Sequence, residues 1–423
     1  DGLRQNINQY VSENEAVDML SQHLITKPVF DAVFSGFSEN NPVSKTMDNV
    51  LHELENCGLQ SETETLKSFY ESVKERINII DNDAGRQKII KDLYERFFQS
   101  AFKKTAERLG IVYTPIEIVD FILRSADWAL RDELNCPEGL ASKNVHILDP
   151  FTGTGTFIVR LLQLGLIPEN IIEYKYKHEL HANEILLLAY YIAAVNIEAA
   201  YHSVRKESSS FEEFPGIVLT DTFNIYDAKG RKLFILFHEN GERTNEQIEK
   251  QITVIIGNPP YSVGQKSAND NNQNVKYPDL DEAIKETYAL ETNATNKNSL
   301  YDSYIRAIRW ASDRIRNGEK GVICFVTNGS FIDSNSADGL RKCLRNDFQS
   351  IYIFNLRGNQ YTSGELSRKE GGKIFGSGSR LPVAVTLMVK DPDRPEQECR
   401  IYYSDIGDYL TRDEKLMKVV KWH

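Results

Sequence analysis

The 423-residue sequence lacks any Cys-x-x-Cys pair, and its five cysteines are scattered along the chain. Zinc sites and small disulfide scaffolds both need cysteines in sets at close spacing, so neither is expected. The longest uncharged apolar run, residues 185–195, is too short to span a bilayer. The polar N-terminus shows no signal-peptide pattern. These absences predict a cytoplasmic protein without a membrane partner.

The chain also lacks an excess of positive charge, since its net charge is −11. Indiscriminate nucleic-acid binding needs a basic surface, so the overall charge argues against it. One local exception is the Gly- and Ser-rich segment 356–380, which carries five basic residues, Arg357, Arg368, Lys369, Lys373 and Arg380, against two acids. This segment is either a flexible basic loop that contacts a ligand or an ordinary solvated loop.

The periodicity of apolar residues changes near residue 140. Upstream, apolar residues recur at helical spacing, as in residues 66–77 and 89–98, which predicts a helical N-terminal domain over residues 1–140. Downstream, short β-branched runs alternate with helix-length segments, which predicts a doubly wound α/β sheet over residues 141–423. The seven expected strands are 145–149, 178–183, 216–220, 252–256, 321–326, 351–355 and 383–389. The extra apolar run 233–237 is expected to be an insertion.

A β-branched run at 254–256 is followed by Gly257 and then by Asn258, Pro259, Pro260 and Tyr261. The prolines end the strand, so Asn258 is expected at its carboxyl end, where open α/β sheets place ligands. The Asn258 side-chain oxygen and the Pro259 carbonyl can accept both N–H bonds of an exocyclic amine and so make it a better nucleophile. Tyr261 offers a face for stacking a base. The alternative is a strand that ends in an ordinary proline turn.

A second motif runs from an apolar strand into an acid, a Gly/Thr turn and a helical pattern. It comprises Asp149, Pro150, Phe151, Thr152, Gly153, Thr154 and Gly155. Glycines permit close approach of a ligand, and a helix N-terminus supplies free N–H groups. The turn lacks the Lys-Ser/Thr ending of a P-loop, so it does not predict ATP binding. It also lacks the third glycine of a dinucleotide fold.

Together these motifs resemble motifs I and IV of S-adenosylmethionine-dependent DNA adenine-N6 methyltransferases. The segment 110–119 is similar to motif X, and the order X, I, IV is that of the gamma class. Strings such as His181-Ala182-Asn183-Glu184 and Phe354-Asn355-Leu356-Arg357 extend the resemblance to the methyltransferase part of Type ISP restriction–modification enzymes. The expected fold is therefore a Rossmann-like, seven-stranded methyltransferase sheet with an N-terminal helical domain.

The resemblance implies an S-adenosyl-L-methionine pocket. Motif X would contribute Tyr113, Thr114 and Pro115, and motif I would contribute residues 149–155, with Asp149 near the cofactor's amino group. Asp221 with Thr222 and Phe223 resembles motif III, whose acid accepts from the cofactor's adenine; a turn-forming Asp is the alternative.

Two acids compete for the role of ribose ligand. Glu184 follows the second predicted strand, where a carboxylate can accept from both ribose hydroxyls. Glu179 lies five residues earlier, and the resemblance favours Glu184 because Asn-Glu-Ile is the matching string. A helix N-terminal acid that serves the helix dipole is the alternative for Glu184.

Phe375 and two histidines are the remaining candidate site residues. Phe375, just before the last predicted strand, resembles the gamma-class aromatic that stacks on a flipped-out adenine, and an ordinary core phenylalanine is the alternative. His178 and His181 are spaced by three, which on a strand puts them on opposite faces, so no metal is expected.

The reaction expected from this pattern is methyl transfer from S-adenosylmethionine to adenine N6 of double-stranded DNA, within a restriction–modification system. The alternatives are methylation of RNA or of a protein glutamine, and a non-catalytic module that binds cofactor or DNA within a larger enzyme. No helicase P-loop, nuclease motif or target-recognition region is recognisable. These parts are therefore expected on a longer polypeptide.

Overall fold

The computed structural model describes residues 13–33, 40–56, 114–205, 212–227, 237–260, 276–315, 319–375, 380–394 and 398–421. The predicted helical stripes at 66–77 and 89–98, and all of the 233–237 run except Phe237, lie outside these ranges. Within them, no helix has the length and hydrophobicity that a bilayer crossing requires.

Eight strands of the described residues form one sheet in the order β3-β2-β1-β4-β5-β7-β6-β8. Their bounds are β1 His146–Asp149, β2 Leu180–Glu184, β3 Ile217–Leu219, β4 Ile252–Gly257, β5 Gly321–Asn328, β6 Ser350–Arg357, β7 Val383–Lys390 and β8 Arg400–Asp405. Strands β1 to β5 are mutually parallel, whereas β7 runs antiparallel to both β5 and β6. The expected Rossmann-like methyltransferase sheet is confirmed, with eight strands in place of seven.

Two expectations about individual strands need correction. Strand β8 at one edge of the sheet was not predicted, because its sequence is short and most of its residues are exposed. The second strand begins at Leu180 rather than at 178, since residues 169–178 continue as a helix. His178 is therefore the last residue of a helix, and the face argument that used it as a strand residue was wrong.

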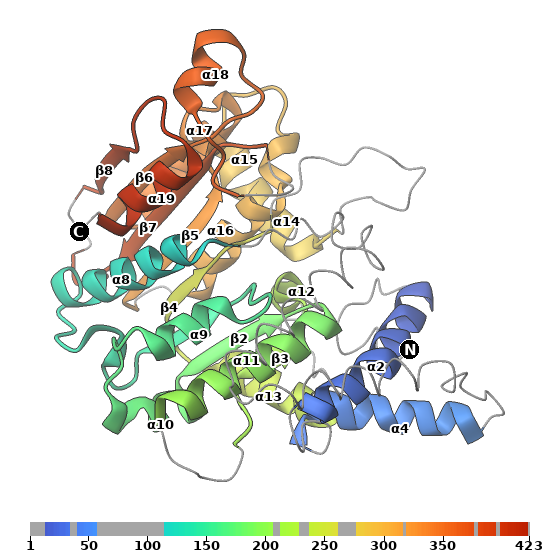
Figure 1. Cartoon of the computed structure of the whole chain (residues 1–423). Coiled ribbons are helices and arrows are strands. Elements are labelled where there is room, and N and C mark those ends of the chain that lie inside the picture. The colour runs from blue at the N-terminus through green and yellow to red at the C-terminus, as the bar shows by residue number, and fades with distance from the viewer. Residues whose placement is uncertain are drawn as a thin grey trace.

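Helices cover both faces of the sheet (Figure 1). One row consists of α19 (Arg412–Lys421), α8 (Ile116–Asp132), α9 (Thr156–Gln163) and α11 (Leu187–Arg205), in which each helix contacts the next. Outside this row lie α10 (Glu169–His178), α12 (Thr222–Asp227), α13 (His238–Glu249), α14 (Pro278–Glu286), α15 (Tyr288–Glu291), α16 (Ser303–Arg314), α17 (Asp338–Asp347) and α18 (Gly364–Glu370). Helix α16 packs against β5, and α14 lies between α12 and α16.

The described N-terminal helices, α2 (Glu13–Val33) and α4 (Pro42–Asn56), pack against each other, and α2 packs on α11 (Figure 1). Two buried polar contacts join them to α11: His23 Nδ1 lies 2.9 Å from the Tyr191 hydroxyl, and Asn41 Nδ2 donates to the Tyr190 hydroxyl at 3.2 Å. Buried polar contacts require matched geometry, so they fix the position of the helical region on the sheet domain.

Candidate active site

The two sequence motifs meet because β1 and β4 are neighbouring parallel strands. Leu148 pairs with Ile255, so Asp149 and Asn258 follow their strands at the same carboxyl edge. Gly257 lets the strands approach here, since a Cβ at this position would lie 3.0 Å from Asp149 Oδ1. Asn258 Nδ2 donates to Thr114 Oγ1 at 2.9 Å, which brings the motif X-like segment to the same place. Tyr113 and Tyr261 lie outside the described residues.

Asp149 is the most deeply buried acid of the site, with 0 % of its surface exposed. Its Oδ1 accepts from the Phe151 N–H at 3.1 Å, whereas its buried Oδ2 has no hydrogen-bond partner among the described residues. Burial raises the pKa of Asp149 to about 8; the neighbouring Glu184 raises it further, while the Phe151 N–H lowers it. A buried carboxylate oxygen without a donor is costly, so this atom suits a cationic or N–H donor from a ligand.

The glycine turn between β1 and α9 is held by backbone and side-chain contacts. Thr152 Oγ1 donates to the Asp149 carbonyl at 2.9 Å, and the Thr152 N–H donates to the Asn183 carbonyl at 3.0 Å. Gly155 begins α9 with φ +85°, and a Cβ there would lie 3.2 Å from the backbone of Ala193 in α11. Glycine at position 155 is therefore required both for its left-handed conformation and for the close packing of α9 on α11.

Glu184 and Glu179 lie at opposite ends of β2. Glu184 Oε2 accepts from the Gly153 N–H at 2.8 Å, and its Oε1 accepts from the N–H groups of Ile185 and Leu186. Burial raises the pKa of Glu184 to about 7 although these three donors lower it. Glu179 instead forms a buried ion pair with Lys175 at 2.5 Å. Of the two acids, Glu184 is the one beside the glycine turn.

Asp221 follows β3 and is 3 % exposed. Its Oδ1 accepts from the Phe223 N–H at 3.0 Å. The Phe223 ring packs at 5.5 Å, between ring centroids, from Phe151 of the glycine turn. Thr222 Oγ1 donates to the Pro150 carbonyl at 2.6 Å, which ties the β3 end to the β1 end. The motif I-like and motif III-like residues therefore form one continuous surface.

Two residues of this surface were missed by the sequence analysis. Asn183, fully buried in β2, donates to Thr222 Oγ1 at 3.2 Å, and its Oδ1 has no hydrogen-bond partner in the described part of the chain. The Tyr277 hydroxyl donates to Asp221 Oδ2 at 3.0 Å from a position just before α14. Asn183 stands in the Asn-Glu-Ile string used to identify Glu184, but no role was predicted for it. Tyr277 belongs to no recognisable motif, because tertiary packing brings it to the site.

Phe375 and the histidines complete the predicted residues. Phe375 is 1 % exposed and lies in the hydrophobic core, so its stacking role stays a prediction. His181 Nε2 lies 2.9 Å from His146 Nδ1, and burial lowers the pKa of both rings, that of His181 to about 3. No cluster of three metal-ligating side chains occurs among the described residues.

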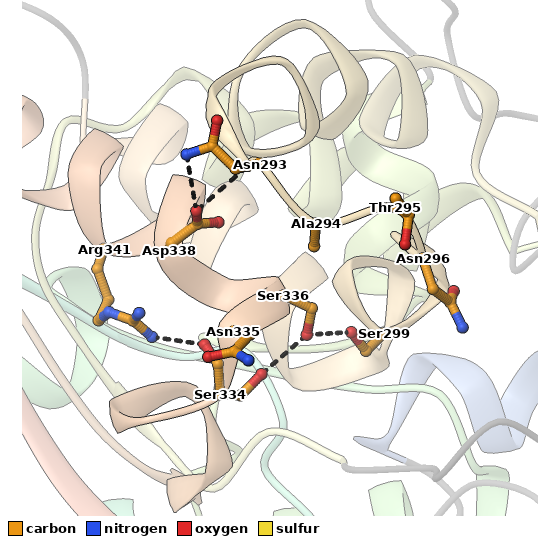
Figure 2. A pocket seen from close by; sticks show the side chains of 10 residues that line it. All are labelled: Asn293, Ala294, Thr295, Asn296, Ser299, Ser334, Asn335, Ser336, Asp338 and Arg341. Carbon is orange, nitrogen blue, oxygen red and sulfur yellow. Dashed lines mark hydrogen bonds between the residues drawn. The ribbon is translucent and has the colours of Figure 1, made fainter.

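A separate polar cleft of about 770 Å³ lies between residues 293–299 and 334–341 (Figure 2). Its side chains hydrogen-bond largely to one another: Ser336 Oγ lies within 2.8 Å of both Ser299 Oγ and Ser334 Oγ, and Asp338 accepts from Asn293. None of the predicted site residues lines this cleft. The candidate site is therefore the edge formed by β1, β2, β3 and β4.

This combination of sheet order, glycine turn and three buried acids places the chain in the methyltransferase class of α/β proteins. The sequence matches the N-6 DNA Methylase family over residues 85–351, and the chain belongs to that family. Residues 1–85 match the coupler domain of Type ISP restriction–modification enzymes. These matches support the DNA interpretation over methylation of RNA or protein. No curated protein matches the chain.

Three solved structures are similar over nearly the whole chain. A nuclease-deletion mutant of the Type ISP enzyme LlaGI, bound to a DNA substrate mimic, is 50% identical with a TM-score of 0.90, covering 99% of this chain and 34% of that one. The ATP-dependent Type ISP enzyme LlaBIII, bound to DNA, is 46% identical with a TM-score of 0.91, covering 100% and 29%.

The third structure is a DrdV–DNA complex, 38% identical with a TM-score of 0.88, covering 100% of this chain and 40% of that one. The chain thus spans between 29% and 40% of the length of these relatives.

Proposed function

We propose that this chain binds S-adenosyl-L-methionine and transfers its methyl group to adenine N6 of double-stranded DNA. The observation that carries the proposal is the meeting of Asp149, Glu184, Asp221 and Asn258 at one edge of the sheet. In parallel α/β sheets this edge is where ligands bind. The family match supplies the reaction class, and the DNA complexes of the similar structures support duplex DNA as the partner.

The residues present fit the cofactor. Asp149 Oδ2 is a buried acceptor without a donor in the described part of the chain, which suits the cofactor's amino group. Glu184 would take the ribose hydroxyls, although its three backbone donors leave limited acceptor capacity. Asp221 would accept from the adenine amine, with Phe223 beside the ring. When bound, the cofactor would supply a methyl group on a sulfonium sulfur, which departs readily as a neutral thioether.

We propose that Asn258 and the Pro259 carbonyl orient and polarise the target amine by accepting its N–H bonds. This contact needs no covalent intermediate, so positioning and hydrogen bonding carry the catalysis. Pro260 fixes the turn, and Tyr261 and Phe375 are proposed to stack on the base. Asn258 Nδ2 donates to the Thr114 hydroxyl at 2.9 Å, and we propose that this bond orients the amide so that its oxygen can accept from the target amine. Tyr113 and Pro115 are proposed to line the methionine end of the pocket.

At the scale of the chain, we propose a helical N-terminal domain over residues 1–140 and a catalytic domain over residues 141–423. Helix α8 belongs to the first range yet packs on β5 and α9, so the two domains share a large contact. We propose that a nuclease like the one deleted from LlaGI, an ATP-dependent activity like that of LlaBIII, and target recognition reside in other parts of a longer polypeptide.

The test measures binding and transfer separately. Calorimetric titration with S-adenosylmethionine should show saturable binding by the wild type and none by Asp221→Ala. Asn258→Ala should bind the cofactor with unchanged affinity but lose transfer of labelled methyl to duplex DNA by at least about 100-fold, the scale of removing an oriented polar contact to the reacting group. Normal transfer by Asn258→Ala would refute the mechanism. Absence of binding by folded wild type would refute the cofactor assignment.

A further inference from the structure

Tyr277 joins the segment before α14 to the acid predicted to hold the cofactor's adenine. Its hydroxyl donates to Asp221 Oδ2 at 3.0 Å, while Asp221 Oδ1 accepts from the Phe223 N–H at 3.0 Å and the Asn224 N–H at 3.4 Å. Both oxygens of the carboxylate are therefore held by donors. A carboxylate held at both oxygens has a fixed orientation relative to the end of β3.

The Tyr277 ring is itself held on two sides. Its ring centroid lies 5.2 Å from that of Phe223 in an edge-to-face arrangement, and the Arg306 guanidinium lies 5.4 Å from the ring centroid. Arg306 makes a two-point ion pair with Asp281 at 2.7 and 3.0 Å. Asp281 also accepts from the Tyr277 N–H at 3.3 Å. Tyr277 and Arg306 are both buried, whereas the Asp281 side chain is 22% exposed. The ion pair and the ring contacts together restrain the Tyr277 ring.

We propose that Tyr277 is a positioning and specificity residue of the cofactor site, one that acts through Asp221 to select a 6-amino purine. The inference rests on the proposed function, because it concerns the adenine end of the same pocket. The Tyr277 hydroxyl donates to Oδ2 and so fixes the orientation of the carboxylate that would accept from the cofactor's amine. A 6-oxo purine presents an acceptor at that position and is repelled by the carboxylate.

The geometry favours an arrangement in which the Tyr277 hydroxyl and the cofactor's amine donate to Asp221 Oδ2 together, over one in which they compete for it. A competing hydroxyl would have to move away when the amine arrives, yet Phe223, Arg306 and Asp281 hold Tyr277 in place. A carboxylate oxygen can accept two hydrogen bonds at once, so the amine needs no displacement of the tyrosine. Tyr277 therefore orients the acceptor and does not block it.

The experiment compares two stable thioether ligands, S-adenosylhomocysteine and S-inosylhomocysteine, by calorimetry on the full chain. Tyr277→Phe keeps the ring and removes the hydroxyl. It should weaken S-adenosylhomocysteine roughly tenfold, the scale of one hydrogen bond to a charged group, and change S-inosylhomocysteine less than about twofold. In an Asp221→Asn background the same substitution should have no further effect, because the acceptor through which it acts is gone.

Tyr288→Phe is the matched control. Tyr288 is also buried, and the Arg309 guanidinium lies 5.4 Å from its ring centroid, but it belongs to α15, away from Asp221. It should change neither affinity. Should Tyr277→Phe prove unstable, Asp281→Asn loosens the same network and should also reduce the preference for the amino ligand.

Three outcomes would overturn the inference. Equal weakening of both ligands would mean that Tyr277 has only a structural role. Tighter binding of S-adenosylhomocysteine would mean that the hydroxyl competes with the amine, and an unchanged preference would mean that Tyr277 does not act on Asp221. Failure of wild type to bind either ligand would instead refute the proposed function itself.

Discussion

At the residue scale, the site gathers two acids whose pKa values are raised by burial. The pKa of Asp149 is raised to about 8 and that of Glu184 to about 7. Both groups lie at the carboxyl edge, and both are proposed to contact the cofactor. The Asp149 and Glu184 carboxyl groups are therefore expected to be partly protonated in the free protein and to lose these protons when a cation binds.

This arrangement predicts pH-dependent cofactor affinity. Below pH 8 the Asp149 carboxyl of the free protein is protonated, so binding a cationic amino group requires loss of that proton. Loss of the Asp149 proton should therefore raise the affinity for S-adenosylmethionine between pH 6 and pH 8, by up to about tenfold per pH unit, and the rise should level off above pH 8. Glu184 should add a second contribution below pH 7. Calorimetry at pH 6, 7 and 8 in buffers of different ionisation enthalpy would measure both the affinity and the proton released.

Asp149→Asn is the control for this prediction, because it cannot release the proton. The variant should bind weakly and lose most of the pH dependence, keeping only the part between pH 6 and 7 that belongs to Glu184. A wild-type affinity that is flat from pH 6 to 8, or an equal slope in the variant, would contradict the assignment of Asp149.

At the element scale, the sequence predicted the strands that are buried and missed the one that is not. The cores of β1, β4 and β5 are apolar runs with distinct ends, so a periodicity argument finds them. Strand β8 carries Tyr402 and Tyr403 with more than two fifths of each side chain's surface exposed, and nothing in its pattern separates it from a loop. Its pairing with β6 is decided by tertiary contacts.

The same limit applies to the site. Asp149, Glu184, Asp221 and Asn258 follow strands, so their common edge could be predicted from the strand pattern. The Tyr277 contact could not be, because it depends on how α14 packs between α12 and α16. The choice between Glu184 and Glu179 likewise needed the ion pair that holds Glu179 to Lys175.

The described residues of the basic segment, 356–375 and 380, contain a short helix that its composition did not predict. This helix is α18. The buried Lys415 ammonium of α19 donates to three carbonyls of the segment at 2.7–2.9 Å, those of Leu356, Glu370 and Gly372. Burial lowers the pKa of Lys415 to about 8. One side chain thus connects the beginning of the segment to its middle.

Lys415→Met should therefore destabilise the chain by about 2–3 kcal/mol, because buried carbonyls lose their donor. Lys418→Met on the same helix is the control; Lys418 is exposed and donates only to the Ile406 carbonyl among the described residues, so its loss should cost less than about 1 kcal/mol. Urea unfolding of both variants at pH 7 would measure the difference. Equal effects would show that the buried ammonium does not support the segment.

The lowered pKa of Lys415 also predicts how the free energy of unfolding changes with pH. Between pH 8 and 10.5 the unfolded chain retains the Lys415 proton that the folded chain has lost, so wild-type stability gains from this group as pH rises through that range. The methionine variant lacks this gain. The gap between wild type and Lys415→Met should widen from pH 8 to pH 10.

At the scale of the whole molecule, charge limits what the chain can do with DNA by itself. The net charge is −11, and several cations of the basic segment are already paired: Arg357 with Asp405 and Asp408, and Arg368 with Glu365. Electrostatic attraction to phosphates supplies most of the affinity of non-specific binding. A chain with a net charge of −11 should therefore bind duplex DNA weakly even with its catalytic edge intact.

We expect a dissociation constant of about 10–100 µM for duplex DNA near physiological salt, in the range of non-specific binding. Fluorescence anisotropy at 50 and 200 mM salt would measure it. If the basic segment contacts the backbone, Lys373→Ala with Arg380→Ala should weaken binding and reduce the salt dependence. The control pair Lys143→Ala with Lys285→Ala removes the same charge elsewhere and should have a smaller effect.

Equal effects of the two pairs would mean that only overall charge matters and that the basic segment is an ordinary solvated surface. Nanomolar binding by the wild-type chain would contradict the expectation more deeply, because it would require sequence-specific contacts within this chain. Weak DNA binding together with measurable cofactor affinity is the expected combination. The residues proposed to hold the cofactor all lie on this chain, whereas firm contact with DNA is expected to need surfaces on other parts of a longer polypeptide.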